Sequence, residues 1–264
     1  MPSANALRLQ IERTLESRFP AALSPMPQTV RETAAAGIAE IDSLLSGGFP
    51  VGAISEITGP ATSGRTCLAL AFCAERTSEG KVCAWIDVND ALDPESAAAN
   101  GVQLRRLLWV RCKSKAERAN GKPWSRLEQA LRAVDLLLQA GGFAAIVLDM
   151  GDIVVEHGSR IPLATWYRFR QAAEQSRCCL VVLGGAAYAQ SSAEIVLECA
   201  PREARGQTVL QGYAFDVQLK RQRAVSANAS INRSAMGAMR KPAASTPAAS
   251  TWTAPNAWAT GATA

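Results

Sequence analysis

The sequence contains a single histidine, His157, among its 264 residues. A catalytic triad or a metal centre built on histidine ligands is therefore nearly excluded. The seven cysteines include no Cys-x-x-Cys pair, and most of them lie within apolar runs. This pattern is typical of buried thiols in a reducing cytoplasm, so we expect neither a zinc site nor a disulfide framework.

Long hydrophobic runs are also missing. The chain has no stretch of about 18 apolar residues that would span a membrane, and its N-terminus begins polar, without the apolar core of a signal peptide. Hydrophobic residues nevertheless make up 48% of the chain, enough for a full core. We therefore expect a cytoplasmic protein without membrane contact, built from one sizeable domain with additional segments.

The formal net charge of +5 is compatible with a nucleic-acid partner but does not demand one. The most concentrated basic stretch lies between an expected strand and an expected helix and consists of Lys113, Lys115, Arg118 and Lys122. These side chains would either contact DNA phosphates, which gives sequence-independent affinity, or form a solvated loop. The charge pattern leaves both interpretations open.

Apolar strands alternate with amphipathic helices between residues 37 and 223. The expected strands cover residues 53–58, 81–87, 107–111, 143–149 and 178–183, and the expected helices cover residues 66–78, 123–140 and about 160–177. This alternation predicts an α/β fold with a mostly parallel sheet and helices on both faces. Two later segments, 194–199 and 208–219, have a hairpin-like alternation that predicts an antiparallel edge.

The two ends of the chain differ from this core. Residues 1–24 predict an N-terminal helix with one apolar stripe, formed by Leu7, Ile11, Leu15 and Phe19. Residues 25–36 predict a proline-rich linker, and whether the helix packs on its own domain or on a neighbouring protomer stays open. Residues 224–264 are rich in Ala, Ser, Thr and Pro and contain no acidic residue, so we expect a disordered tail.

Residues 59–66, Gly-Pro-Ala-Thr-Ser-Gly-Arg-Thr, lie between an expected strand and an expected helix and predict a phosphate-binding loop. Glycines let the backbone approach a phosphate, and the N–H groups at the helix N-terminus face the anion. A glycine-rich turn that binds nothing is the alternative. The candidate nucleotide-binding residues of the loop are Gly59, Pro60, Ala61, Thr62, Ser63, Gly64, Arg65 and Thr66.

Two of these loop residues determine its expected chemistry. Thr66 stands where a hydroxyl meets magnesium, whereas Arg65 stands where a lysine is expected. Arginine keeps the positive charge but carries a planar guanidinium instead of a compact ammonium. Phosphate binding could therefore survive while the geometry for phosphoryl transfer is lost.

Residues 37–111 resemble the core of the RecA recombinase family. The resemblance rests on residues 37–64, which include Gly-Ile-Ala-Glu-Ile-Asp-Ser-Leu-Leu, and on Ile-Asp-Val-Asn-Asp-Ala-Leu-Asp-Pro at 86–94. It is recognisable at 143–149 and faint at 178–223. It implies a RecA-like P-loop core over residues 37–223 that binds ATP and Mg²⁺.

The same resemblance implies roles for individual residues outside the loop. Asp93 matches a residue that contacts adenine, and Asp149 matches the carboxylate that, with Thr66, supports magnesium. Lys220 and Arg223 fall near basic residues that approach the nucleotide of the neighbouring protomer in RecA filaments.

The departures from the family pattern are concentrated at the catalytic positions. Asn89 stands where RecA-type enzymes have the glutamate that activates the attacking water, and an amide cannot take that proton. Met150 replaces a Ser or Thr, and no glutamine follows Leu183. The span 149–199 is too short for the two long DNA-binding loops of RecA. We therefore expect a weak ATPase at most.

This combination resembles ImuA-type proteins, which are RecA-like accessory factors of damage-induced (SOS) translesion synthesis. The resemblance implies two partners, a Y-family polymerase-like protein and an error-prone replicative-type polymerase. The alternative is an ATP-dependent recombinase of RecA type that binds single-stranded DNA and assembles with RecA or with itself. A different P-loop ATPase, such as a circadian-clock or helicase-loader relative, is disfavoured by Ala-Leu-Asp-Pro at 91–94.

Overall fold

The computed structural model describes residues 30–112, 125–151, 153–205, 212–223, 225–226 and 249–255. The chain divides into two units, residues 1–30 and residues 31–264. The helix expected in residues 1–24 lies outside the described residues. Residues 31–264 form the second unit.

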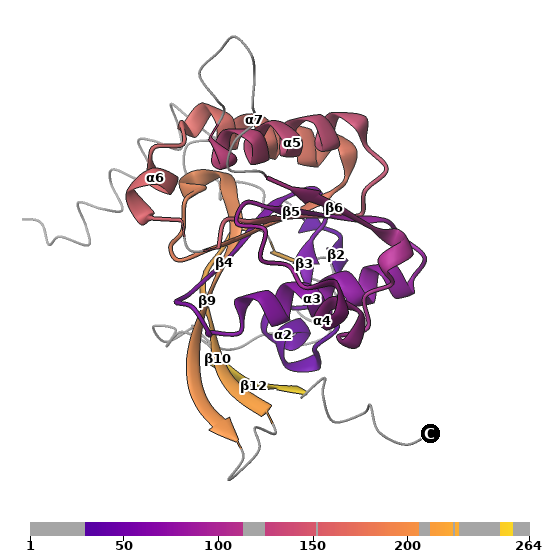
Figure 1. Cartoon of the computed structure of the whole chain (residues 1–264), viewed down its shortest axis with the longest axis vertical. Coiled ribbons are helices and arrows are strands. Elements are labelled where there is room, and N and C mark those ends of the chain that lie inside the picture. The colour runs from indigo at the N-terminus through magenta and orange to yellow at the C-terminus, as the bar shows by residue number, and fades with distance from the viewer. Residues whose placement is uncertain are drawn as a thin grey trace, which may run out of the picture. The chain divides into compact units, whose positions relative to one another are not determined.

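An eight-stranded sheet forms the centre of this unit, in the order β12-β10-β9-β4-β8-β7-β5-β6 (Figure 1). Its strands are β4 (Ile54–Thr58), β5 (Cys83–Asp87), β6 (Leu107–Arg111), β7 (Ala145–Asp149), β8 (Cys179–Gly184), β9 (Ala193–Arg205), β10 (Gly212–Gln222) and β12 (Ala249–Pro255). The pairs from β9 through β4, β8, β7 and β5 to β6 are parallel, whereas β10 pairs antiparallel with both β9 and β12. The expected α/β fold with an antiparallel edge is confirmed.

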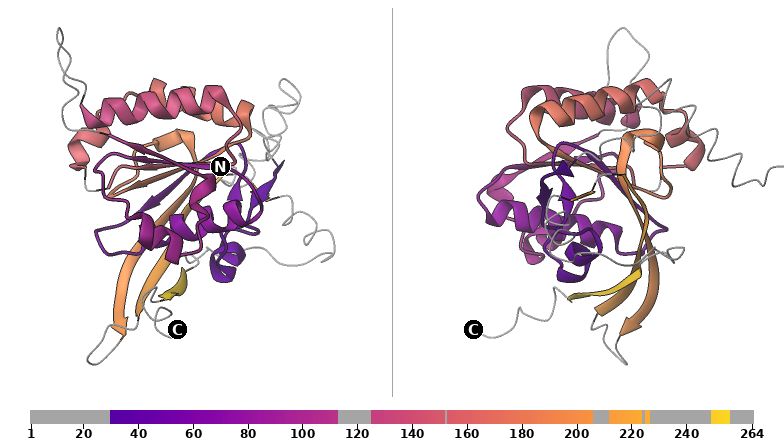
Figure 2. Two further views of the ribbon diagram at one scale, coloured as in Figure 1. Left: turned by 45° about the vertical axis from the view of Figure 1, so that its right-hand side comes forward. Right: turned by 180° about the vertical axis from the view of Figure 1, so that it is seen from behind.

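Helices cover both faces of the sheet (Figures 1 and 2). One face carries α2 (Ala39–Leu44), α3 (Arg65–Ser78) and α4 (Pro94–Ala99), and the other carries α5 (Arg126–Ala140) and α7 (Leu163–Ser176). Successive residues of a strand point to opposite faces. On β5, Trp85 therefore packs in the same core as Leu68 of α3, and Ile86 packs in the same core as Val134 of α5.

Short elements complete the described part of the chain. They are β1 (Val30–Arg31), β2 (Thr33–Ala34), β3 (Phe49–Pro50), α6 (Val155–Ser159), β11 (Val225–Ser226) and the 3₁₀ turns η1 (Leu104–Arg106) and η2 (Gln190–Ser192). No helix among the described residues is long and apolar enough to cross a membrane. All seven cysteines are free thiols, and six of them are buried.

The linker expected over residues 25–36 includes regular structure at its C-terminal end. β2 pairs antiparallel with β3, so that Thr33 lies opposite Pro50 and Ala34 opposite Phe49. Gly48, with φ +113°, makes this close approach possible, because a Cβ there would lie 2.1 Å from the Ala34 carbonyl oxygen. The packed domain therefore begins before residue 37.

The tail expected to be disordered contains β12, in which Trp252 lies opposite Phe215 of β10. The composition of the tail predicts only that it cannot fold alone. An edge strand such as β10 offers unpaired backbone groups that a further strand can bond, so this segment needs no core of its own. The tail residues 227–248 and 256–264 lie outside the described residues.

Candidate nucleotide-binding site

The expected phosphate loop connects β4 to α3, and its backbone follows a path that glycine makes possible. Gly59 has φ +151° and Gly64 has φ +86°. A Cβ on Gly59 would lie 2.3 Å from the Cys199 carbonyl oxygen, and one on Gly64 would lie 2.5 Å from the ring of Phe215. The loop is also tied to the end of β8, where the Gly59 N–H donates to the Gly184 carbonyl oxygen at 3.2 Å.

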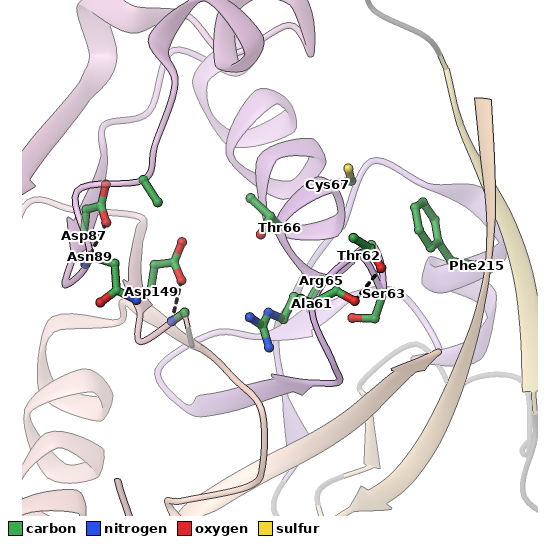
Figure 3. Close-up of a pocket in the computed structure, with 13 residues that line it drawn as sticks. Ala61, Thr62, Ser63, Arg65, Thr66, Cys67, Asp87, Asn89, Asp149 and Phe215 are labelled. Atoms are coloured by element: carbon green, nitrogen blue, oxygen red, sulfur yellow. Dashed lines mark hydrogen bonds between the residues drawn. The ribbon is translucent and has the colours of Figure 1, made fainter. Parts of the chain in front are cut away.

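A cavity of about 390 Å³ lies beside the loop. Its lining brings together eight predicted residues, namely Ala61, Thr62, Ser63, Gly64, Arg65, Thr66, Asn89 and Asp149. In Figure 3, Asp87, Asn89 and Asp149 gather at one end and Phe215 lies at the other, with the loop between them. Parallel strands β5 and β7 deliver the acidic end, because their carboxyl termini meet at one edge of the sheet.

Arg65 occupies the position in the loop where a phosphate-binding lysine is expected. Its side chain begins in the first turn of α3 and is only 7% exposed. One guanidinium nitrogen, Nη1, donates to the Gly59 carbonyl oxygen at 2.5 Å. The positive charge of Arg65 is therefore engaged by the backbone of the loop itself. A lysine that reaches a terminal phosphate would instead leave this carbonyl oxygen free.

Ser63 carries the polar atom of the loop that the protein leaves unsatisfied. The residue is completely buried, and its Oγ has no hydrogen-bond partner among the described residues. A buried hydroxyl without a partner costs about 1–3 kcal/mol. The loop therefore holds a donor that a bound anion would satisfy.

Thr66 and Asp149 both line the cavity, as a magnesium site requires. Asp149 lies at the end of β7, is 8% exposed and accepts a hydrogen bond from the Gly151 N–H at 2.9 Å. Within the described ranges, no group of three or more His, Cys, Asp or Glu side chains forms a metal cluster. The residues fit Mg²⁺, which typically binds one or two protein oxygens together with waters and phosphate.

Asn89 and Asp87 form the wall opposite the loop. Asp87 is fully buried, and its carboxylate accepts from the N–H groups of Asn89 and Leu92 and from the indole of Trp109, at 3.2, 2.8 and 3.3 Å. Asn89 packs on Gly151, where a Cβ would lie 2.3 Å from its amide nitrogen. The Asn89 side chain in this wall is thus an amide, which does not accept a proton as a carboxylate does.

Asp90, the acid next to Asn89, points out of this wall. Its backbone is in the left-handed region, with φ +59°. Its carboxylate forms a two-pronged ion pair with Arg111, at 2.5 and 2.6 Å. It does not line the cavity.

Gly59, Pro60 and Asp93 are the predicted nucleotide-binding residues that do not line the cavity. Asp93 is exposed and caps the N-terminus of α4, where it accepts from the Glu95 and Ser96 N–H groups and from the Ser96 hydroxyl. The hydroxyl and then the backbone of Ser96 lower the pKa of Asp93. Its carboxylate is therefore engaged within its own helix.

The remaining candidates lie elsewhere. Lys220 is exposed and pairs with Glu198 at 2.6 Å, and Arg223 is exposed and donates to the Ser191 carbonyl oxygen at 2.5 Å. Both belong to the region around β9 and β10, outside the cavity. The basic residues Lys113, Lys115, Arg118 and Lys122 lie outside the described residues.

Phe215 is a cavity residue that the sequence did not single out. It is 4% exposed, lies on β10 and packs on Gly64 of the loop, about 150 residues earlier in the chain. The alternating pattern of residues 208–219 predicted only a strand with one apolar face. Which element that face would contact depends on the strand order, and one sequence does not give that order.

Comparisons with known proteins agree with this architecture. The family model of the RecA N-terminal domain matches residues 6–158. Protein RecA of Colwellia psychrerythraea is 40% identical over 119 residues, which are 45% of this chain and 31% of that protein. Protein RecA of Borreliella afzelii is 36% identical over 144 residues, 54% of this chain and 36% of that protein. The chain thus spans about a third of the length of these curated relatives.

A solved structure gives the same result for the fold. The crystal structure of the RadB recombinase matches 72% of this chain and 90% of its own chain, with a TM-score of 0.54 and 19% sequence identity. At this identity the likeness concerns the fold.

Proposed function

Because this chain belongs to the RecA N-terminal domain family, we propose that it is a RecA-like DNA repair protein that serves as an accessory factor of damage-induced translesion synthesis. In this role it binds nucleotide weakly and hydrolyses it slowly or not at all. It works in the cytoplasm beside a Y-family polymerase-like protein and an error-prone replicative-type polymerase. The observation that carries the proposal is the buried Arg65 guanidinium bonded to Gly59.

Two side chains support a weak nucleotide site. Arg65 donates a charge-assisted hydrogen bond to the Gly59 carbonyl oxygen, so this bond must break before the side chain can bind a terminal phosphate. Asn89 offers no basic group to the attacking water. The phosphate cradle is therefore retained, whereas the groups that make phosphoryl transfer fast are replaced.

The remaining residues still fit ATP and Mg²⁺. The backbone of residues 59–66 and the Ser63 hydroxyl would hold the phosphates, and Thr66 and Asp149 would hold the metal. Bound magnesium would neutralise negative charge on the phosphates. We expect nucleotide affinity no tighter than micromolar.

The second candidate is an ATP-dependent recombinase of RecA type. It is favoured by the survival of Thr66 and Asp149 in one cavity and by the relatives named Protein RecA. In that case Lys220 and Arg223 would contact the nucleotide of a neighbouring protomer in a filament. Single-stranded DNA would be bound with help from Lys113, Lys115, Arg118 and Lys122.

Calorimetry with the full chain separates these candidates at the level of the site. MgATP is titrated with and without single-stranded DNA, and phosphate release is measured in parallel. The accessory role predicts weak binding and no DNA-stimulated hydrolysis. Tight binding with rapid hydrolysis that Asp149→Ala abolishes would instead support the recombinase.

A genetic experiment tests the biological role. The gene is deleted in its own organism, and both the damage-induced mutation frequency and the homologous recombination frequency are measured. The accessory role predicts that induced mutation falls while recombination is unchanged. Complementation with a gene that encodes Arg65→Ala then tests whether Arg65 is needed for induced mutation. If the deletion lowers only the recombination frequency, the proposal is rejected.

A further inference from the structure

A second cavity, of about 860 Å³, lies on the α5 and α7 side of the sheet. Its wall is made by the start of α5, by α6 and by the residues that lead into α7. Asn89 lines this groove as well as the nucleotide cavity, so the two cavities share one wall residue. The volume lies within the range of about 300–1,000 Å³ that is usual for ligand sites.

The floor of this groove is aliphatic. It is lined by five aliphatic side chains, Val88, Leu127, Leu131, Ile153 and Ile161. The apolar character continues onto the adjoining surface, where Val155 is 46% exposed and Leu163 is 48% exposed. Apolar side chains that line a groove and lie exposed next to it in sequence are more often part of an interaction site than scattered single residues are.

The rim of the groove is basic. Arg126 and Arg160 line it, and neither forms an ion pair with another residue that the structure describes. The acid at the rim, Glu128, directs its carboxylate to the Ser125 N–H at 2.7 Å and completes the N-terminal cap of α5. The groove therefore presents two arginine side chains beside an apolar floor, and the carboxylate of Glu128 is held by the Ser125 N–H.

From this combination we propose that the groove docks a short peptide segment of a partner protein, with aliphatic or aromatic side chains on the floor and acidic residues paired with Arg126 and Arg160. Arginine binds a carboxylate through two parallel hydrogen bonds, which fixes orientation as well as charge. The proposal goes beyond the function proposed above, because it assigns a binding surface that requires no nucleotide.

The lining favours a peptide over single-stranded nucleic acid. Sequence-tolerant binders of single strands stack bases on aromatic side chains. The groove is lined by aliphatic side chains, and no Phe, Tyr or Trp among the described residues belongs to its wall. Its positive charge alone would suit either ligand, but its floor suits branched aliphatic or aromatic side chains of a protein.

Selection from a phage-displayed library of random 12-residue peptides on the immobilised full chain tests the proposal. We expect the enriched sequences to combine acidic residues with Leu, Ile or Phe. One enriched peptide is then synthesised with a fluorescent label, and its affinity is measured by anisotropy. A version with Asp and Glu changed to Asn and Gln serves as the peptide control.

Charge reversal locates the binding. The Arg126→Glu/Arg160→Glu variant is expected to bind the peptide at least tenfold more weakly, whereas Arg105→Glu, which reverses an exposed arginine outside the groove, is expected to bind it normally. Far-ultraviolet circular dichroism checks that both variants are folded. Acid-free selected peptides, or equal affinity for the two variants, would overturn the proposal. A thymidine 30-mer that binds the native groove more tightly than every selected peptide, and loses binding in the double variant, would assign it to nucleic acid.

Discussion

The substitution Arg65→Lys separates the structural and nucleotide-binding roles of the loop. In the ligand-free protein the change removes the hydrogen bond from the buried guanidinium to the Gly59 carbonyl oxygen, 2.5 Å long. A hydrogen bond to a charged group contributes about 1.5–3 kcal/mol. In a chain of this size each kcal/mol shifts the melting temperature by roughly 2–4 °C, so we expect melting about 3–12 °C lower.

With MgATP present, the Arg65→Lys variant is expected to gain more stability than the unmodified protein does. The lysine ammonium is compact and its stem is flexible, so it reaches a phosphate without giving up a bond to the loop. A ligand at 100 times its dissociation constant stabilises the folded state by about 2.7 kcal/mol. We therefore expect saturating MgATP to raise the melting temperature of Arg65→Lys clearly and that of the unmodified protein only slightly, as measured by differential scanning calorimetry.

Arg76→Lys is the matched control. Arg76 is also a buried arginine of α3, 4% exposed, and its guanidinium donates to the Ala35 carbonyl oxygen, away from the phosphate loop. This variant is expected to lose stability and to keep the small nucleotide response of the unmodified protein. A melting-temperature response of Arg65→Lys to MgATP that is no larger than that of Arg76→Lys would refute the role assigned to Arg65.

Three further variants test other contacts. Phe215→Ala removes a ring that is 4% exposed and is expected to lower the free energy of unfolding by about 3–5 kcal/mol in urea titrations; a loss below 1 kcal/mol would show that the ring contributes little packing. Burial raises the pKa of Glu56 above its ordinary 4.5, so the folded state binds the proton more strongly than the unfolded state does. The free energy of unfolding is therefore expected to fall as the pH rises from about 4.5 through the raised pKa. Glu56→Gln keeps an acceptor for the backbone N–H groups of Tyr188 and Ala189 and is expected to remove this pH dependence. A difference in unfolding free energy between the variant and the unmodified protein that does not change with pH would contradict the raised pKa of Glu56. Truncation after residue 248 removes β12 and exposes the edge of β10, and light scattering is expected to show concentration-dependent association that the full chain lacks.

The order of strands and helices in the core could be predicted from the sequence because both patterns are local. Buried parallel strands appear as short apolar runs, such as 143–149, and the helices between them have apolar residues at helical spacing. The turn between β4 and α3 was equally predictable, since its glycines and its place between a strand and a helix are local features. The structure places β7 at Ala145–Asp149, within the expected range.

Contacts between distant segments could not be predicted in the same way. Asp93 shows a local contact instead: the family resemblance assigns it to adenine, which stays a prediction, and its carboxylate caps α4 through bonds to Ser96. An Asp followed by Pro-Glu-Ser is also a typical helix start, because its side chain accepts the first free N–H groups. Phe215 and β12 required knowledge of which strands are neighbours, which a single sequence does not provide.

The conformation of the phosphate loop is weaker evidence for nucleotide binding than its shape suggests. Gly59 is required by the nearby Cys199 carbonyl, and Gly64 by the ring of Phe215, so packing alone demands both glycines whether or not a nucleotide binds. Arg65 likewise has a structural role in its bond to Gly59. The Ser63 hydroxyl differs, because it is buried without a partner among the described residues and packing gives it no compensation. Ser63→Ala should therefore be neutral or stabilising in the ligand-free protein and should weaken anion binding, which makes this hydroxyl the most direct probe of whether the loop still holds a phosphate.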